Sequence, residues 1–236
     1  MQDNGGYIYT TNAKLSSQLS NARLTQALLS LADMKGRKVL DIGCGDGTYT
    51  VELFERCRPG LLHGIDPARS GIDCAQARAE GLPITFQCAS AYSLPYPNTT
   101  FDWAIFRGVL HHLEHPEAAL GEALRVSRRL IALEPNGLNP IVKILEKVSP
   151  YHRQHDEKSF APWTLDKWVK AQGGCVTQRL YVGLVPMFCP NWFARIFKVL
   201  EPLVERIPLM RLLSCAQYVF TAEARDVART PRESSA

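Results

Sequence analysis

The sequence lacks the hydrophobic runs and cysteine pairs that would place the chain in a membrane or an oxidising compartment. No uninterrupted apolar stretch approaches the roughly 20 residues that cross a bilayer, and residues 1–7 have neither a basic start nor an apolar run. The seven cysteines are widely spaced, without a C-x-x-C pair typical of zinc or redox sites. We therefore expect a cytoplasmic protein with reduced thiols and no metal site.

The sequence also lacks a concentration of charge of one sign. There are 27 lysines and arginines against 23 acidic residues, which gives a net charge of +4, and the basic residues are scattered along the chain. This pattern does not indicate a nucleic-acid partner. With 46% hydrophobic and 21% charged residues, the 236-residue chain has the composition of a folded globular protein.

Strand-like and helix-like segments alternate from residue 38 to residue 134. This alternation predicts an α/β fold, with a doubly wound and mostly parallel sheet. A helix over 13–34, with Asn12 and Ser20 as candidate caps, precedes the sheet. The expected strands are 38–42, 61–66, 83–88, 101–106, 129–134, 175–185 and 216–222, and the expected later helices are 48–57, 69–79, one that begins at Pro116, and 191–206.

The seven expected strands fit one Rossmann-like domain over residues 1–224. Within it we expect an N-terminal helical cap at 1–35, a core at 36–136, and a lid and C-terminal strands at 137–224. Residues 149–163 are rich in His, Pro and charge and predict a loop or lid. The last two strands predict an antiparallel pair, and residues 225–236 predict a flexible tail.

Three glycines stand where the first strand turns into a helix, in the sequence VLDIGCGDG at residues 39–47. Glycine lets the backbone approach a ligand closely and adopt positive φ. The dinucleotide pattern G-x-G-x-x-G would need a third glycine at position 48, which is Thr48. Asp41 and Asp46 would repel a pyrophosphate but suit the ammonium and sulfonium of S-adenosylmethionine.

Asp66 ends the second strand, in the sequence GID at residues 64–66. A carboxylate at this place can accept hydrogen bonds from both ribose hydroxyls of an adenosine. The alternative is that Asp66 only caps the helix that follows Pro67.

These segments, taken in order, resemble the class I S-adenosylmethionine-dependent methyltransferases, in particular the ubiquinone/menaquinone-type group called methyltransferase type 11. The resemblance covers residues 36–136 and implies that they are the cofactor-binding core, with the acceptor side at 137–224. Besides VLDIGCGDG and GID, it rests on SAYSLPYPNTTFD at 90–102, VLHHLEHP at 109–116 and LIALEP at 130–135.

The resemblance implies S-adenosyl-L-methionine as the cofactor and S-adenosyl-L-homocysteine as its product. The cofactor-binding residues that it implies are Asp41, Gly43, Cys44, Gly45, Asp46, Asp66, Pro67, Ser90, Ala91, Arg107 and Gly108. The family usually has an acid at the position of Ser90, so the adenine contact falls here to a hydroxyl or to the backbone of Ala91. The Asn/Asp-Pro-Pro-aromatic motif of nucleic-acid amino-methyltransferases is replaced by residues 105–108, which read IFRG.

Methyl transfer from a sulfonium needs alignment of donor and nucleophile more than chemical groups on the protein. A hydroxyl acceptor would also need a general base. His111 and His112 are candidates from the fourth-strand loop, with structural packing as the alternative reading, and His152 and His155 are candidates from the lid.

The C-terminal third contains a helix-forming stretch with three aromatics, Trp192, Phe193 and Phe197. It could pack on the sheet, roof an acceptor pocket, or bring residues 188–213 to a membrane surface. We predict O-methylation of a small hydrophobic acceptor that resembles a lipid, quinone or polyketide. The alternatives are C- or N-methylation of a small metabolite, a non-catalytic relative that binds cofactor or lipid, and an NAD(P)-dependent oxidoreductase.

Overall fold

The structure is a computed structural model that describes residues 13–148, 158–187 and 189–224. Seven strands form one sheet in the order β3-β2-β1-β4-β5-β7-β6. Strands β1 to β5 are parallel, whereas β7 is antiparallel to both β5 and β6. This confirms the predicted sheet with its antiparallel C-terminal pair. The strands are β1 (Lys38–Ile42), β2 (Leu61–Asp66), β3 (Ile84–Cys88), β4 (Phe101–Arg107), β5 (Ser127–Pro135), β6 (Gly174–Val182) and β7 (Gln217–Ala224).

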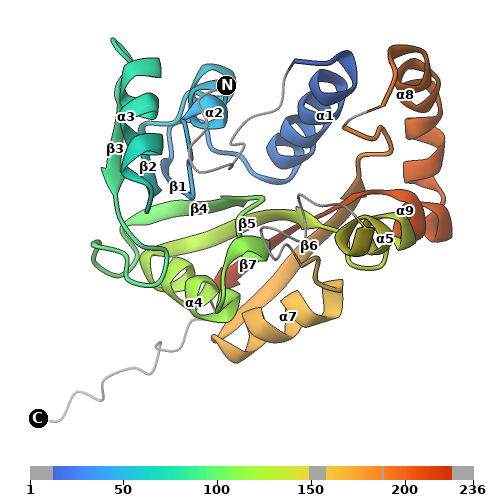
Figure 1. The fold of residues 1–236 in the computed structure, drawn as a ribbon. Coiled ribbons are helices and arrows are strands. Elements are labelled where there is room, and N and C mark those ends of the chain that lie inside the picture. Colours follow the sequence, from blue (N-terminus) through green and yellow to red (C-terminus); the bar gives the residue numbers. More distant parts are fainter. Residues whose placement is uncertain (1–12, 149–157, 188, 225–236) are drawn as a thin grey trace, which may run out of the picture.

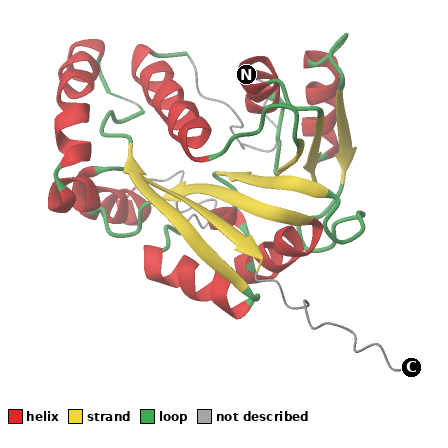
Figure 2. Ribbon diagram, turned by 180° about the vertical axis from the view of Figure 1, so that it is seen from behind, coloured by secondary structure: helices red, strands yellow, loops and turns green. Residues whose placement is uncertain are grey.

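Helices cover both faces of the sheet, as Figures 1 and 2 show. Helices α1, α2 and α3 lie on one side of the strands, and α4 and α7 lie on the other. Helix α8 packs against α1 and α9, and α9 lies between α5 and β6. The helices are α1 (Leu15–Leu31), α2 (Thr48–Cys57), α3 (Arg69–Arg78), η1 (Leu110–His112), α4 (Pro116–Val126), α5 (Pro140–Val148), α7 (Pro162–Ala171), α8 (Asn191–Arg206) and α9 (Pro208–Ser214).

The two largest apolar clusters of the core are separated by the sheet, and a smaller one lies under α3. Successive residues of β4 point to opposite faces, so Trp103 and Ile105 join the layer under α1 and α2, while Ala104 and Phe106 join the layer under α4 and α7. Burial on both faces explains why the central strands β1, β4 and β5 are rich in apolar residues. Because side chains alternate along β1, Asp41 lies on the same face of the sheet as Val39, under α1 and α2.

The structure corrects two local predictions. Ser20 is not a cap but lies buried inside α1, whose N-cap is Lys14, and the Ser17 hydroxyl accepts the Lys14 N–H. The predicted loop at 149–163 ends earlier than expected, because Pro162 begins α7. Proline suits the first helical position, where no N–H partner is needed.

Helix α5 was not predicted from the turn-like sequence at 136–140. It begins because the Asn139 side chain accepts the N–H groups of Ile141 and Val142, which are left without partners at a helix start. Asn12, His152, His155 and the predicted tail at 225–236 lie outside the described residues. Among the described helices, none has both the length and the apolar character that a membrane span requires.

Candidate active site

The glycine turn at the carboxyl end of β1 has no room for side chains. Gly43 and Gly47 have φ angles of +77° and +75°. A Cβ atom on Gly43 would lie 2.6 Å from Val109 Cγ2, and one on Gly47 would lie 2.7 Å from Ala75 Cβ. The turn is held to β2 because the Gly43 N–H donates to the Ile65 carbonyl at 2.7 Å. The turn therefore packs closely against the chain's own residues, and its contact with Val109 joins the ends of β1 and β4.

Asp66 is buried beside this turn at the end of β2. Its Oδ2 accepts the Gly45 N–H at 3.0 Å and its Oδ1 accepts the Ala68 N–H at 2.8 Å. Burial raises the pKa of this carboxyl, and the two N–H groups oppose the rise. Each oxygen keeps a second acceptor site. Asp66 thus steadies the turn and the start of α3, and it can still accept from a diol.

Asp46 is held by its own neighbours. Its carboxylate accepts the Thr48 N–H at 3.1 Å near the start of α2 and pairs with Arg78 at 3.0 Å. The charge of Asp46 is thus partly balanced within the chain. The predicted preference of the turn for a cation therefore depends less on Asp46 than on Asp41 and Asp66.

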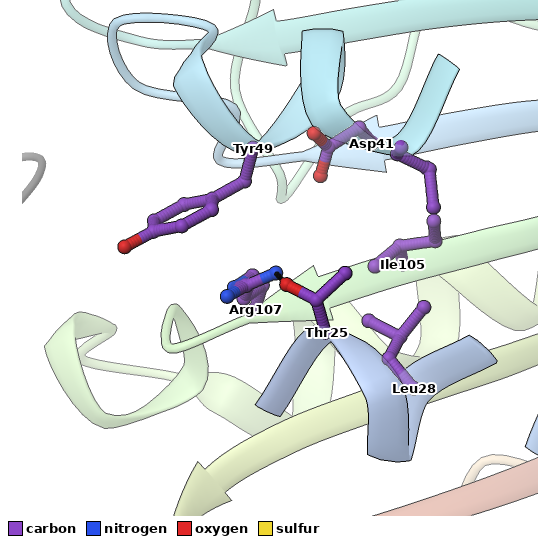
Figure 3. Close-up of a pocket in the computed structure, with 7 residues that line it drawn as sticks. Thr25, Leu28, Asp41, Tyr49, Ile105 and Arg107 are labelled. Carbon is purple, nitrogen blue, oxygen red and sulfur yellow. Dashed lines mark hydrogen bonds between the residues drawn. The ribbon is translucent and has the colours of Figure 1, made fainter. Parts of the chain in front are cut away.

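Asp41 and Arg107 line one small pocket together with Thr25 and Tyr49 (Figure 3). Arg107 donates to the Thr25 hydroxyl at 2.7 Å. Asp41 Oδ2 accepts the Thr50 hydroxyl at 2.6 Å. The Arg107 guanidinium also lies 3.7 Å from the centre of the Tyr49 ring. The pocket is lined by Thr25, Leu28, Asp41, Tyr49, Leu53, Ile105 and Arg107.

The pocket perturbs both of its charged groups. Burial raises the pKa of Asp41 to about 6, against the opposing effects of the Thr50 hydroxyl and the Arg107 charge. Burial lowers the pKa of Arg107. A buried carboxyl and a half-buried guanidinium thus face one small pocket, and their opposite charges suit a ligand that carries both charges.

A second polar centre joins the ends of β4 and β5. Glu134 is fully buried, and its carboxylate accepts the N–H groups of Val109 and Leu110 at 2.9 and 2.8 Å. His111 Nδ1 lies 2.8 Å from Glu134 Oε2. When Nδ1 carries the proton, Nε2 of His111 is left as the basic nitrogen. This arrangement orients His111 as a carboxylate orients a general base.

His111 lies at the same edge of the sheet as the glycine turn. Its Cε1 is 3.6 Å from the position of a Cβ atom on Gly108, and its ring centre is 3.9 Å from that of His112. Val109, between Gly108 and η1, packs against Gly43. The structure thus brings together Gly43, Gly108 and His111 at the β1–β4 switch point, where ligands of open α/β sheets bind.

The remaining predicted cofactor residues lie in the glycine turn and in the loops after β2 and β3. The Cys44 side chain turns toward α3 and joins an apolar cluster with Ile72 and Ala75, so it is the Cys44 backbone that faces the turn. Ser90 is exposed in the loop after β3, and its hydroxyl accepts the Tyr92 N–H at 3.2 Å. Ala91 is buried in the core, and exposed Pro67 follows Asp66.

Sequence reasoning missed Glu134, Thr25 and Tyr49 as members of the site. An acid at the end of the aliphatic run LIALE was a usable signal for Glu134, because a buried carboxylate needs partners. Thr25 and Tyr49 gave no comparable signal, since they come from helices whose packing brings them to Arg107.

Comparison with known proteins matches residues 39–129 to the family described as a methyltransferase domain. An uncharacterized methyltransferase of Schizosaccharomyces pombe is 36% identical over 103 residues, which are 40% of this chain and 37% of that protein. The norajmaline N-methyltransferase of Rauvolfia serpentina is 32% identical over 135 residues, which are 52% of this chain and 46% of that protein. The matched parts thus span less than half the length of these curated relatives.

The fold is shared over nearly the whole chain. A structure of an S-adenosylmethionine-dependent methyltransferase from Thermotoga maritima superimposes with a TM-score of 0.65 at 20% identity, covering 89% of this chain and 92% of that one. Residues 39–129 thus match a methyltransferase domain, and the chain shares the fold of this solved structure. The resemblance found in the sequence is confirmed at this level, and the type 11 group is consistent with it.

Proposed function

We propose that this protein transfers the methyl group of S-adenosylmethionine to a small acceptor at the carboxyl edge of β1 and β4. The observation that carries the proposal is the joint geometry of the Gly43 turn, the buried Asp66 and the Asp41–Arg107 pocket. Asp66 has acceptor sites for the ribose hydroxyls. Arg107 would bind the carboxylate of the methionine part and Asp41 its ammonium, and the pocket would thus match a zwitterion.

Bound cofactor would supply a methyl group on a sulfonium, whose positive charge disappears on transfer. The chain's own residues align the partners and exclude water. We assign His111 as the general base that takes a proton from a hydroxyl acceptor, with Glu134 as its positioning residue. His112, whose ring is tilted against that of His111, is assigned to shape the site rather than to remove the proton.

The acceptor that we propose is small and hydrophobic, and the product an O-methyl compound. Two features support this assignment, namely the His111–Glu134 pair and the many apolar side chains exposed on α5, α8 and α9. C- or N-methylation of a small metabolite is the alternative. N-methylation is supported by the relative from Rauvolfia serpentina, which is named as an N-methyltransferase. We extend the same proposal to one catalytic domain over residues 1–224 that works in the cytoplasm.

Binding and labelling test the proposal in two steps. S-adenosylhomocysteine at 100 times its dissociation constant should add about 2.7 kcal/mol to the free energy of unfolding. NADH should add nothing, and stabilisation by NADH alone would overturn the proposal. Incubation of a metabolite and lipid extract with methyl-labelled cofactor should then label an apolar product in mass spectrometry. An inactive His111→Gln variant with intact cofactor binding would favour an O-methyl product.

A further inference from the structure

Helix α8 has its apolar stripe turned away from the protein. Trp192, Ile196, Val199 and Leu203 follow the i, i+4, i+7, i+11 spacing of one helix face, and they are 65, 49, 79 and 58% exposed. A surface helix of a globular protein normally turns such a stripe to the core. The prediction from sequence that this helix could simply pack on the sheet does not account for this orientation.

The inner side of α8 is held by acids instead. Glu201 is almost fully buried, accepts the Leu184 N–H at 3.1 Å and pairs with Lys198 at 2.5 Å. Glu205 pairs with Arg23 of α1 at 2.5 Å and accepts the Gly183 N–H at 3.2 Å. These bonds fix the rotation of the helix, so the exposed stripe is a built feature of the fold.

Two neighbouring helices continue the apolar surface. On α5, Ile144 and Val148 are 58 and 62% exposed, and on α9, which packs against α5 and α8, Leu209 is 66% exposed. We call the outer surface of these helices the α5–α8–α9 face. Helix α5 follows β5, and α8 and α9 connect β6 to β7, so the face borders the carboxyl edge of the sheet that holds the candidate site (Figure 1).

The charge on this face has one sign. Helices α5, α8 and α9 lie entirely within the described residues and contain three acids, Glu146, Glu201 and Glu205. Each of the three is hydrogen-bonded within the chain, and none is classed as exposed. The exposed charges of α5 and α8 are basic, namely Lys147, Arg195 and Arg206. Glu201 and Glu205, which stand between Arg195 and Arg206 in the sequence, are therefore turned away from the outer surface.

We propose that the α5–α8–α9 face docks the protein on the surface of an anionic lipid bilayer. Amphipathic helices with large apolar residues and basic flanks lie in the interface, with apolar side chains among the acyl chains and cations near the headgroups. Contiguous exposed apolar surface that is rimmed by polar residues marks protein or membrane interaction sites. The basic charge selects an anionic surface, and docking brings the carboxyl edge of the sheet near the lipid.

Co-sedimentation with vesicles tests this without cofactor or acceptor, so its result does not depend on the proposed methyl transfer. The full chain should sediment with vesicles of phosphatidylcholine and phosphatidylglycerol in equal amounts, and less with phosphatidylcholine alone. Arg195→Glu/Arg206→Glu should bind at least about thirtyfold more weakly, since each basic residue near an anionic surface strengthens binding roughly fivefold. The matched control is Lys35→Glu/Arg37→Glu, which makes the same charge change at exposed positions before β1.

The apolar part is tested by Val199→Glu/Leu203→Glu, which should weaken binding at least about tenfold. Gln76→Glu/Ala77→Glu adds the same charge to exposed positions of α3 and should bind nearly as the unchanged chain does. Circular dichroism checks that all variants fold. Equal binding by the α8 variants and their controls would overturn the proposal. So would a dimer, seen in sedimentation without lipid, that Val199→Glu/Leu203→Glu dissociates, because the face would then join two copies of the chain.

Discussion

Buried acids serve the site edge and helix α8 in different ways. At the site edge, Asp66 and Glu134 accept backbone N–H groups. Asp66 keeps acceptor sites for a ligand, and Glu134 orients the ring of His111. Under α8, Glu201 and Glu205 also accept backbone N–H groups, but each is paired with a cation of the chain. The same residue type thus builds a reactive centre in one place and fixes the rotation of a helix in the other.

The largest effect that we expect at the site edge comes from Gly43→Ala. A Cβ at φ +77° and 2.6 Å from Val109 should abolish binding of S-adenosylhomocysteine and lower the free energy of unfolding by about 2–4 kcal/mol. Calorimetric titration and thermal unfolding measure both. Gly81→Ala is the control, since φ is +78° there but nothing lies within 4 Å, and it should cost only about 1 kcal/mol.

The free energy of unfolding should depend on pH because the pKa of Asp41 is raised in the folded protein. Its folded pKa of about 6 lies above the ordinary 3.8, so deprotonation destabilises the fold as pH rises between these values. In Asp41→Asn this fall should vanish. The stability of the variant relative to the unchanged chain should therefore increase by up to about 3 kcal/mol between pH 3 and pH 7. Urea unfolding across this range measures the difference, and parallel pH curves would contradict the assignment.

Glu134→Gln and Glu201→Gln test the comparison directly. Both should lower the free energy of unfolding by about 1–3 kcal/mol, because each leaves a backbone N–H with a poorer partner. Only Glu134→Gln should lower kcat for methyl transfer, by about a hundredfold, with an altered pH profile and little further loss when combined with His111→Gln. Equal kcat losses in the two variants would make Glu134 a purely structural residue.

The smallest effect should follow from Arg78→Ala. The pair with Asp46 is partly exposed, with 43 and 20% of the two side chains accessible, so its removal should cost less than about 1 kcal/mol. Cofactor affinity, measured by calorimetry, should change less than in Asp41→Asn. A larger loss of affinity in Arg78→Ala would return Asp46 to a direct role in the site.

The sequence by itself determined the fold class, the strands and the glycine turn. These depend on local patterns, and the ranges predicted for β1, β2, α2 and α8 agree with the observed ones. Helices α5 and α7 were harder to predict, because α5 is short and has no buried residue, and α7 begins within the polar stretch predicted as a loop.

Only the tertiary structure decided which residues share a site and which way α8 faces. Arg107, Thr25 and Tyr49 come from three elements, and their contact follows from the packing of α1 and α2 on β4. The rotation of α8 depends on bonds from Glu201 and Glu205 to Leu184 and Gly183, many residues away in the chain. Sequence periodicity gives a helix its apolar stripe, but only its long-range partners determine whether that stripe is buried.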